Sequence, residues 1–170
     1  MFRKLFTLSL VLISFRLSAQ LQVSKLIGKN SEKFSLGYGG FIKYAHPVSD
    51  GSDISLEIGF VSFSLKSNDA YGWIVIPLKA GYRYTLNQTG HGFYVEPFVG
   101  YNFVGVDPAD KRFTGLVYGG GTGYLFKPAG KLNIDLGIQY ESALHAGGAA
   151  NYLSLRLTHN FGGGRRNDED

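Results

Sequence analysis

Residues 73–84 read WIVIPLKAGYRY, and this stretch decides the fold class. Successive side chains of a β-strand point to opposite faces. Ile74 and Leu78 therefore share one face, while Lys79 and Arg83 share the other. The same period of two recurs in six further segments, at 34–44, 54–60, 93–103, 116–126, 132–141 and 152–161. Since no helical period of useful length accompanies it, the sequence predicts an all-β protein.

A weaker candidate strand lies at residues 21–27, and strand-breaking residues separate the stronger segments. The predicted turns are His46-Pro47 with 49–52, Asn87 to Gly90, and Lys127 to Gly130. Bacterial single-chain membrane barrels have an even number of strands, so the weak segment is counted as a strand. We predict an all-β fold, an eight-stranded antiparallel transmembrane β-barrel with up-and-down meander topology, over residues 20–161. A polar C-terminal tail, residues 162–170, follows it.

The bulky face of the strands indicates what surrounds the barrel. In the first strong segment this face consists of Phe34, Leu36, Tyr38, Gly40, Ile42 and Tyr44, and comparable faces recur in the other segments. Eight strands enclose an interior just wide enough for side chains to fill, and such a face would overfill it. The opposite face carries glycines and a few charges, which suits a narrow lumen. The bulky face is therefore predicted to point into lipid, and not inward as in a soluble barrel.

Residues 1–19 have the features of a signal peptide. Arg3 and Lys4 form a positive n-region, an apolar stretch spans 5–15, and cleavage is expected between Ala19 and Gln20. The apolar stretch is shorter than the roughly 20 residues that a membrane-spanning helix needs. An uncleaved membrane anchor is the alternative. Without the cations of this segment the formal charge falls from +4 to +1, which argues against a nucleic-acid partner.

Aromatic residues on the bulky face gather near one end of the strands. If the mature N-terminus is periplasmic, the periplasmic rim carries Tyr44, Tyr82, Tyr84, Tyr124, Phe126 and Phe161. Amphipathic rings favour the interface between membrane and water. The aromatic pattern thus supports the membrane barrel. Phe161 is the last apolar residue of the alternating pattern, and we expect it to serve as the assembly signal.

Several segments, taken in order, resemble those of a known family. They are the signal end Ser18-Ala19-Gln20, the strand 76–84 (IPLKAGYRY), the strand 93–101 (FYVEPFVGY), and a last strand ending on Phe161. The chain resembles the small bacterial outer-membrane β-barrel domain family, of the OmpA, OmpX and OmpW type. The resemblance covers nearly all of the chain after residue 19. It implies insertion into the outer membrane by the outer-membrane assembly machinery. The tail 162–170 departs from the family pattern, which usually ends beside the final aromatic residue.

Eight charged residues fall on the face predicted to line the lumen: Lys43, Lys79, Arg83, Arg156, Glu57, Glu96, Asp135 and Glu141. The four cations balance the four acids, in a space where a charge is costly unless it is paired. We expect pairs between neighbouring strands: Lys79 or Arg83 with Glu96, and Asp135 or Glu141 with Arg156. Packed among glycines and the rings of Tyr94, Phe98 and Tyr152, this charge network is predicted to close the lumen.

Residues that could support other chemistry are few. Cysteine is absent, and the four histidines show no metal-ligand spacing, so we expect no metal site and no cofactor. The glycine run 119–123 has no helix after it and does not match a phosphate-binding loop. A lipid-modifying enzyme would need a nucleophile and a base, for which Ser142 and His145, beside Glu141 in a predicted outer loop, are the candidates. Their spacing establishes no triad, and we predict that the protein is not an enzyme.

These features predict a small outer-membrane β-barrel with a structural or interaction role. The expected partners are outer-membrane lipids and the assembly machinery, and the expected state is a monomer. One alternative is the passage or binding of small apolar molecules, and a lipid-modifying enzyme is a weaker one. Aqueous pores are built from about 16 strands, so we expect no stable ion conductance.

Overall fold

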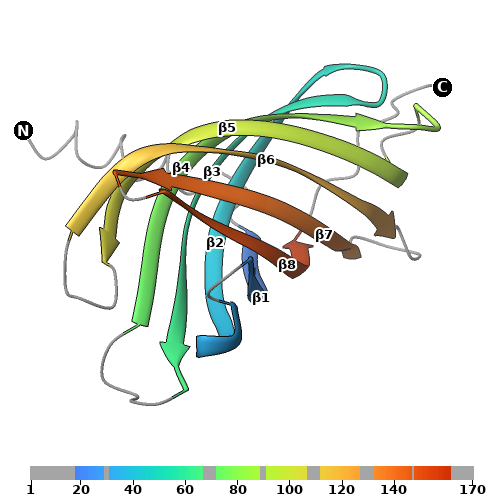
Figure 1. Ribbon diagram of the computed structural model, residues 1–170. Coiled ribbons are helices and arrows are strands. Elements are labelled where there is room, and N and C mark those ends of the chain that lie inside the picture. The colour runs from blue at the N-terminus through green and yellow to red at the C-terminus, as the bar shows by residue number, and fades with distance from the viewer. Residues whose placement is uncertain are drawn as a thin grey trace, which may run out of the picture.

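The computed structural model describes residues 18–28, 31–66, 72–88, 91–106, 112–126, 132–146 and 148–161. Its strands form one closed antiparallel barrel in which sequence neighbours pair and β1 pairs with β8 (Figure 1). The strands are β1 (Ser18–Ile27), β2 (Phe34–Ser49), β3 (Ser52–Leu65), β4 (Gly72–Thr85), β5 (Gly92–Val106), β6 (Arg112–Phe126), β7 (Leu132–His145) and β8 (Gly148–Phe161). A short 3-10 turn, η1 (Ser31–Lys33), precedes β2. The predicted eight-stranded meander is confirmed.

β1 confirms the weakest predicted strand and extends it. Gln22 pairs with Gly39 of β2 and with Arg156 of β8, so β1 closes the barrel. The strand includes Ser18 and Ala19, which precede the predicted cleavage point. Residues 1–17 and the tail 162–170 lie outside the described residues, so the signal peptide and the tail stay predictions. Among the described residues no helix is long and apolar enough to cross a membrane.

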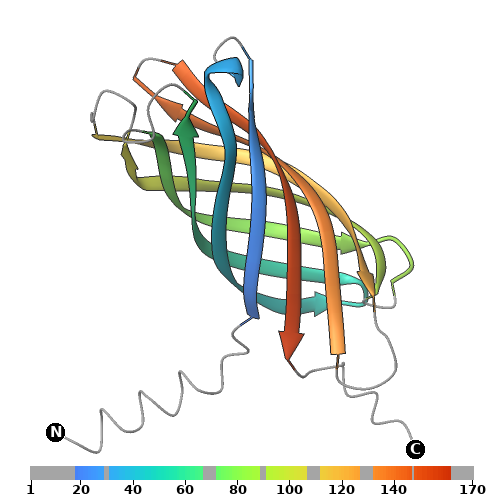
Figure 2. The ribbon, with the colours of Figure 1, turned by 90° about the horizontal axis from the view of Figure 1, so that it is seen from below.

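The two ends of the barrel differ. β1 begins and β8 ends at what we call the proximal end (Figure 2). The turn between β2 and β3 also lies there, and Gly51 completes it with a φ of 76°, which residues with a Cβ rarely adopt. The predicted turn after β4 is present too, with Gln88 at φ 56°, although residues 89 and 90 lie outside the described part. We call the opposite end, where β1 and β3 end, the distal end.

The predicted turn at His46-Pro47 is wrong, because β2 continues to Ser49. His46 pairs with Ile54 of β3, and Pro47 pairs with Asp53. The register shifts between Pro47 and Ser49. Proline has no N–H to donate, and such an irregularity of the ladder is where a strand accepts it. The connection is thereby confined to residues 50–51.

The outer surface of the barrel is apolar, as the alternation predicted. Large exposed side chains on it include Leu21, Ile42, Leu56, Phe60, Val99, Leu116, Ile138 and Leu155. Near the proximal end Tyr44, Tyr82 and Phe126 are exposed, and Tyr84 and Tyr124 are half-buried. Hydrocarbon accepts such a surface and water does not. A closed barrel also leaves no strand edge unpaired in lipid, so this is a barrel that crosses a membrane.

The prediction that Phe34 faces lipid is wrong. The register between β2 and β3 shifts between Phe34 and Gly37, which interrupts the alternation. The side chain of Phe34 turns into the barrel and is only 7% exposed, while Ser35 and Leu36 are both exposed. A shift of this kind leaves the residue types unchanged, so the sequence pattern alone does not reveal it.

Candidate functional site

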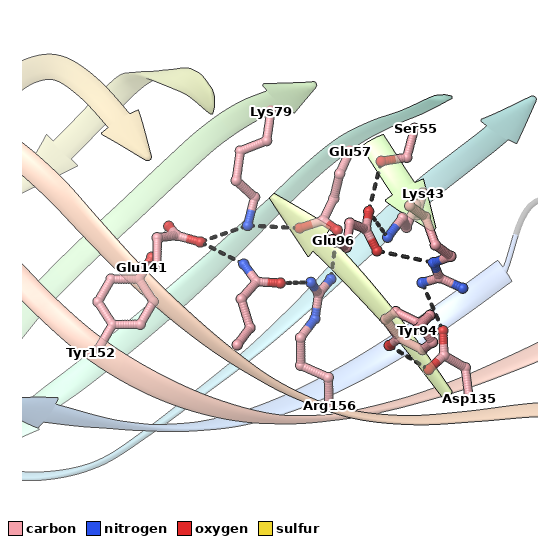
Figure 3. A network of polar contacts seen from close by, with 12 residues as sticks. Lys43, Ser55, Glu57, Lys79, Tyr94, Glu96, Asp135, Glu141, Tyr152 and Arg156 are labelled. Carbon is pink, nitrogen blue, oxygen red and sulfur yellow. Dashed lines mark hydrogen bonds and ion pairs between the residues drawn. The ribbon is translucent and has the colours of Figure 1, made fainter. Parts of the chain in front are cut away.

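The eight charged residues predicted to line the lumen all lie inside the barrel. They come from β2, β3, β4, β5, β7 and β8 and converge in one network (Figure 3). Their side chains are at most 11% exposed, and each belongs to at least one ion pair. The ion pairs form two chains, in each of which positive and negative charges alternate.

The Arg83 chain consists of Lys43, Glu96, Arg83 and Asp135. Lys43 Nζ contacts Glu96 Oε1, and Arg83 Nε donates to Glu96 Oε2 over 3.0 Å. Arg83 Nη2 lies 2.8 Å from Asp135 Oδ2. Ser55 Oγ donates a further hydrogen bond of 2.7 Å to Glu96 Oε1. Two cations and two acids make this chain neutral, which lowers the cost of burying the charges.

The Lys79 chain consists of Arg156, Glu57, Lys79 and Glu141. Arg156 Nη2 lies 2.6 Å from Glu57 Oε2, and Lys79 Nζ lies 2.8 Å from Glu57 Oε1. Lys79 Nζ also donates to Glu141 Oε2 over 2.6 Å. Gln139 closes the chain into a ring, since it donates to Glu141 over 2.9 Å and accepts from Arg156 Nη1. This chain is neutral as well.

Aromatic rings surround the charges. The contacts are Arg83 over Tyr94 at 3.9 Å, Arg156 over Phe41 at 3.4 Å, and Lys79 over Phe98 at 4.9 Å, each to the ring centroid. A cation over a ring face is attracted by the negative potential of that face. Two tyrosine hydroxyls donate hydrogen bonds to the acids. Tyr94 donates to Asp135 over 2.7 Å, and Tyr152 donates to Glu141. The charged groups are thus held by hydrogen bonds as well as by opposite charges.

Inward glycines make room for these rings. A Cβ on Gly123 or on Gly137 would lie 2.6 Å from the Tyr94 hydroxyl oxygen. A Cβ on Gly119 would lie 2.6 Å from Cζ of Phe98. Real Cβ atoms do not come so close to other atoms. The glycine run of β6 therefore accommodates lumenal side chains, in line with the sequence analysis, and forms no phosphate loop.

The predicted pairing is right for Arg83 with Glu96 and wrong for Arg156. Arg156 on β8 reaches Glu57 on β3, and forms no ion pair with Asp135 or Glu141. The pairs Lys43–Glu96, Lys79–Glu141, Arg83–Asp135 and Arg156–Glu57 each join strands three places apart around the barrel. The prediction considered only neighbouring strands. In a narrow lumen, long side chains also meet from nearly opposite walls.

Apolar side chains pack together in the distal half of the lumen, a feature absent from the predictions above. We call this cluster the distal plug: Leu26, Phe34, Val61, Phe63, Val75, Val117, Ala143, Ala150 and Tyr152, with Leu65, Trp73 and Phe98 packed against it. Phe63 and Tyr152 meet edge to face, with ring centroids 5.4 Å apart. A signal was available in Phe60-Val61 and in the run 73–76, which are apolar on both faces of their strands.

The candidate catalytic residues do not form a site. Ser142 and His145 belong to β7 and not to a loop. Ser142 is buried, with only 2% of it exposed, and alternation along β7 points it away from the lumen, where the carboxylate of Glu141 pairs with Lys79. The ring of His145 packs 5.1 Å from that of Trp73, between centroids. Within the described ranges no group of three or more His, Asp or Glu side chains could hold a metal ion.

The fold is similar to that of solved outer-membrane proteins. Ail, the attachment invasion locus protein of Yersinia pestis, gives a TM-score of 0.57 at 14% identity, over 85% of this chain and 95% of that chain. Neisserial surface protein A gives 0.54 at 14% identity, over 85% and 92%. The N-terminal β-barrel domain of Pseudomonas aeruginosa OprF gives 0.53 at 16% identity, over 85% and 97%. No protein-family model matches the sequence, and no curated protein matches it significantly.

The closed eight-stranded fold is thus shared with small bacterial outer-membrane barrels. The apolar outer surface is the property that such a barrel needs in a bilayer. Together they indicate an integral protein of the cell outer membrane.

Proposed function

We propose that this protein is a structural or interaction component of the outer membrane whose lumen is closed to ions. The observation that supports the proposal is that charged and apolar side chains from different strands meet inside the barrel at successive heights. The Arg83 chain lies nearest the proximal end, the Lys79 chain follows it, and the distal plug occupies the other half. The hydrogen bond from Tyr152 to Glu141 joins the plug to the Lys79 chain. On this proposal the proximal end is periplasmic and the barrel acts as a monomer among outer-membrane lipids.

The strand bounds favour a role for the barrel wall over one for long loops. At the distal end the strands are joined by residues 28–33, 66–71, 107–111 and 146–147. Segments of this length offer a partner little surface. A structural role, or an interaction through the wall and the surrounding lipids, therefore suits the chain better than adhesion through extended loops.

Conductance of the purified protein in planar lipid bilayers tests the closed lumen. We expect no stable single-channel currents, because two ion-pair chains and an apolar plug lie in series along the pathway. A sixteen-stranded porin inserted under the same conditions is the positive control. Steady currents from the unmodified protein would contradict the proposal and favour the passage of small molecules instead.

A further inference from the structure

Two buried polar atoms in the lumen have no hydrogen-bond partner. They are Oε1 of Gln20 on β1 and Nε of Arg156 on β8. The two residues are only 5% and 9% exposed. A buried donor or acceptor without a partner is costly, so each atom calls for an explanation. One atom is an acceptor and the other a donor, and the two therefore require complementary partners.

Both residues line the same cavity. It measures about 20 Å³, and its wall includes all four residues of the Arg83 chain together with Arg156 of the Lys79 chain, Gln139 and Thr158. A water molecule needs at least about 10–15 Å³ on this scale, so the cavity has room for one. It also has polar partners on several sides, whereas cavities that stay dry are apolar.

The charge of the wall decides which ligand fits. An anion would meet Glu96 and Asp135, and a cation would meet Arg83 and Arg156. The ion pairs of the wall are already complete, so a charged ligand would add an uncompensated buried charge. A small neutral molecule that both donates and accepts hydrogen bonds adds none. Water meets these requirements.

We propose that this cavity is a structural water site, in which a bound water donates to Gln20 Oε1 and accepts from Arg156 Nε. The water connects β1 to the charge network. On β1 the inward side chains around this position are Gln20, Gln22 and Ser24, which carry no charge. Arg156 Nη1 and Nη2 already donate to Gln139 and Glu57, so the water supplies a hydrogen-bond partner for the remaining nitrogen, Nε. The site fixes the first strand at the place where the barrel closes on itself.

Water-edited solid-state NMR of the membrane-embedded protein, with arginine labelled with ¹⁵N, tests the site. The Arg156 Hε signal is assigned from its loss in Arg156→Lys. We expect magnetisation transfer from water to Arg156 Hε in the unmodified protein, and its loss in Gln20→Leu. Gln22→Leu is the matched control, because Gln22 is also inward and buried on β1 but does not line the cavity. The control is expected to keep the transfer.

Two results would overturn the water site. One is the absence of magnetisation transfer from water to Arg156 Hε in the unmodified protein. This measurement tests the water site even if Gln20→Leu does not fold. The other is equal transfer in Gln20→Leu and in the unmodified protein. Neither result depends on ion conductance, so the water site and the closed lumen are tested separately.

Discussion

The substitution Glu96→Ala perturbs the Arg83 chain at an acid with three partners. Glu96 contacts Lys43, accepts from Arg83 Nε over 3.0 Å and accepts from Ser55 Oγ over 2.7 Å. Without Glu96, Lys43 has no ion pair left among the described residues, whereas Arg83 keeps Asp135. Both Lys43 and Glu96 are nearly buried, with side chains 8% and 10% exposed. The substitution therefore leaves one buried cation unpaired.

Breaking a buried ion pair by removing one partner costs about 3–5 kcal/mol, most of it from the charge left behind. We expect Glu96→Ala to lower the free energy of unfolding by that amount. The double variant Lys43→Met/Glu96→Gln removes both charges and leaves the Arg83–Asp135 pair intact. It is expected to regain most of the loss, because no unpaired charge stays in the lumen.

Equilibrium urea unfolding in phospholipid vesicles measures both variants. Trp73 is the single tryptophan of the chain and packs against the distal plug, so its fluorescence reports on the barrel interior. A loss below about 1 kcal/mol for Glu96→Ala would refute the reasoning, because that is the range of solvated surface pairs. A double variant less stable than Glu96→Ala would refute it too, since the unpaired lysine would then not be the cause.

Three further predictions concern the plug and the two ends of the chain. Phe63→Ala is expected to destabilise the barrel by about 3–5 kcal/mol, because it opens a cavity in the plug. Phe60→Ala, on the outer face, should cost clearly less in the same assay. Equal losses from the two substitutions would contradict a packed plug. Mass spectrometry of the protein from membranes should show cleavage between Ala19 and Gln20, and a mass that retains residues 1–19 would contradict the signal peptide. Phe161→Ala should reduce the amount of folded, heat-modifiable barrel, while deletion of 162–170 should not. If the deletion reduces that amount more than Phe161→Ala does, the assembly signal lies in the tail.

The sequence predicts strand positions and faces well because alternation follows directly from strand geometry. Lys79 and Arg83 lie in the lumen and Leu78 faces outward, as their spacing requires. Even the weak segment of β1 could be assigned, since bacterial single-chain membrane barrels have an even number of strands. Local geometry explains the two errors in β2. The register shift after Phe34 changes which way that residue points, and no residue type predicts it. The sequence pattern places Pro47 in a turn, whereas β2 continues through it beside a second register shift.

Pairing inside the lumen depends on quantities that a sequence does not contain. Arg156 and Glu57 are 99 residues apart in the chain and meet only because strand stagger brings β8 and β3 to the same height. The choice of partners nevertheless follows a rule. Each chain contains two cations and two acids, so neither leaves a net charge in an interior of low dielectric constant. A charge count over the inward positions predicts this neutrality, whereas the individual contacts require the closed barrel.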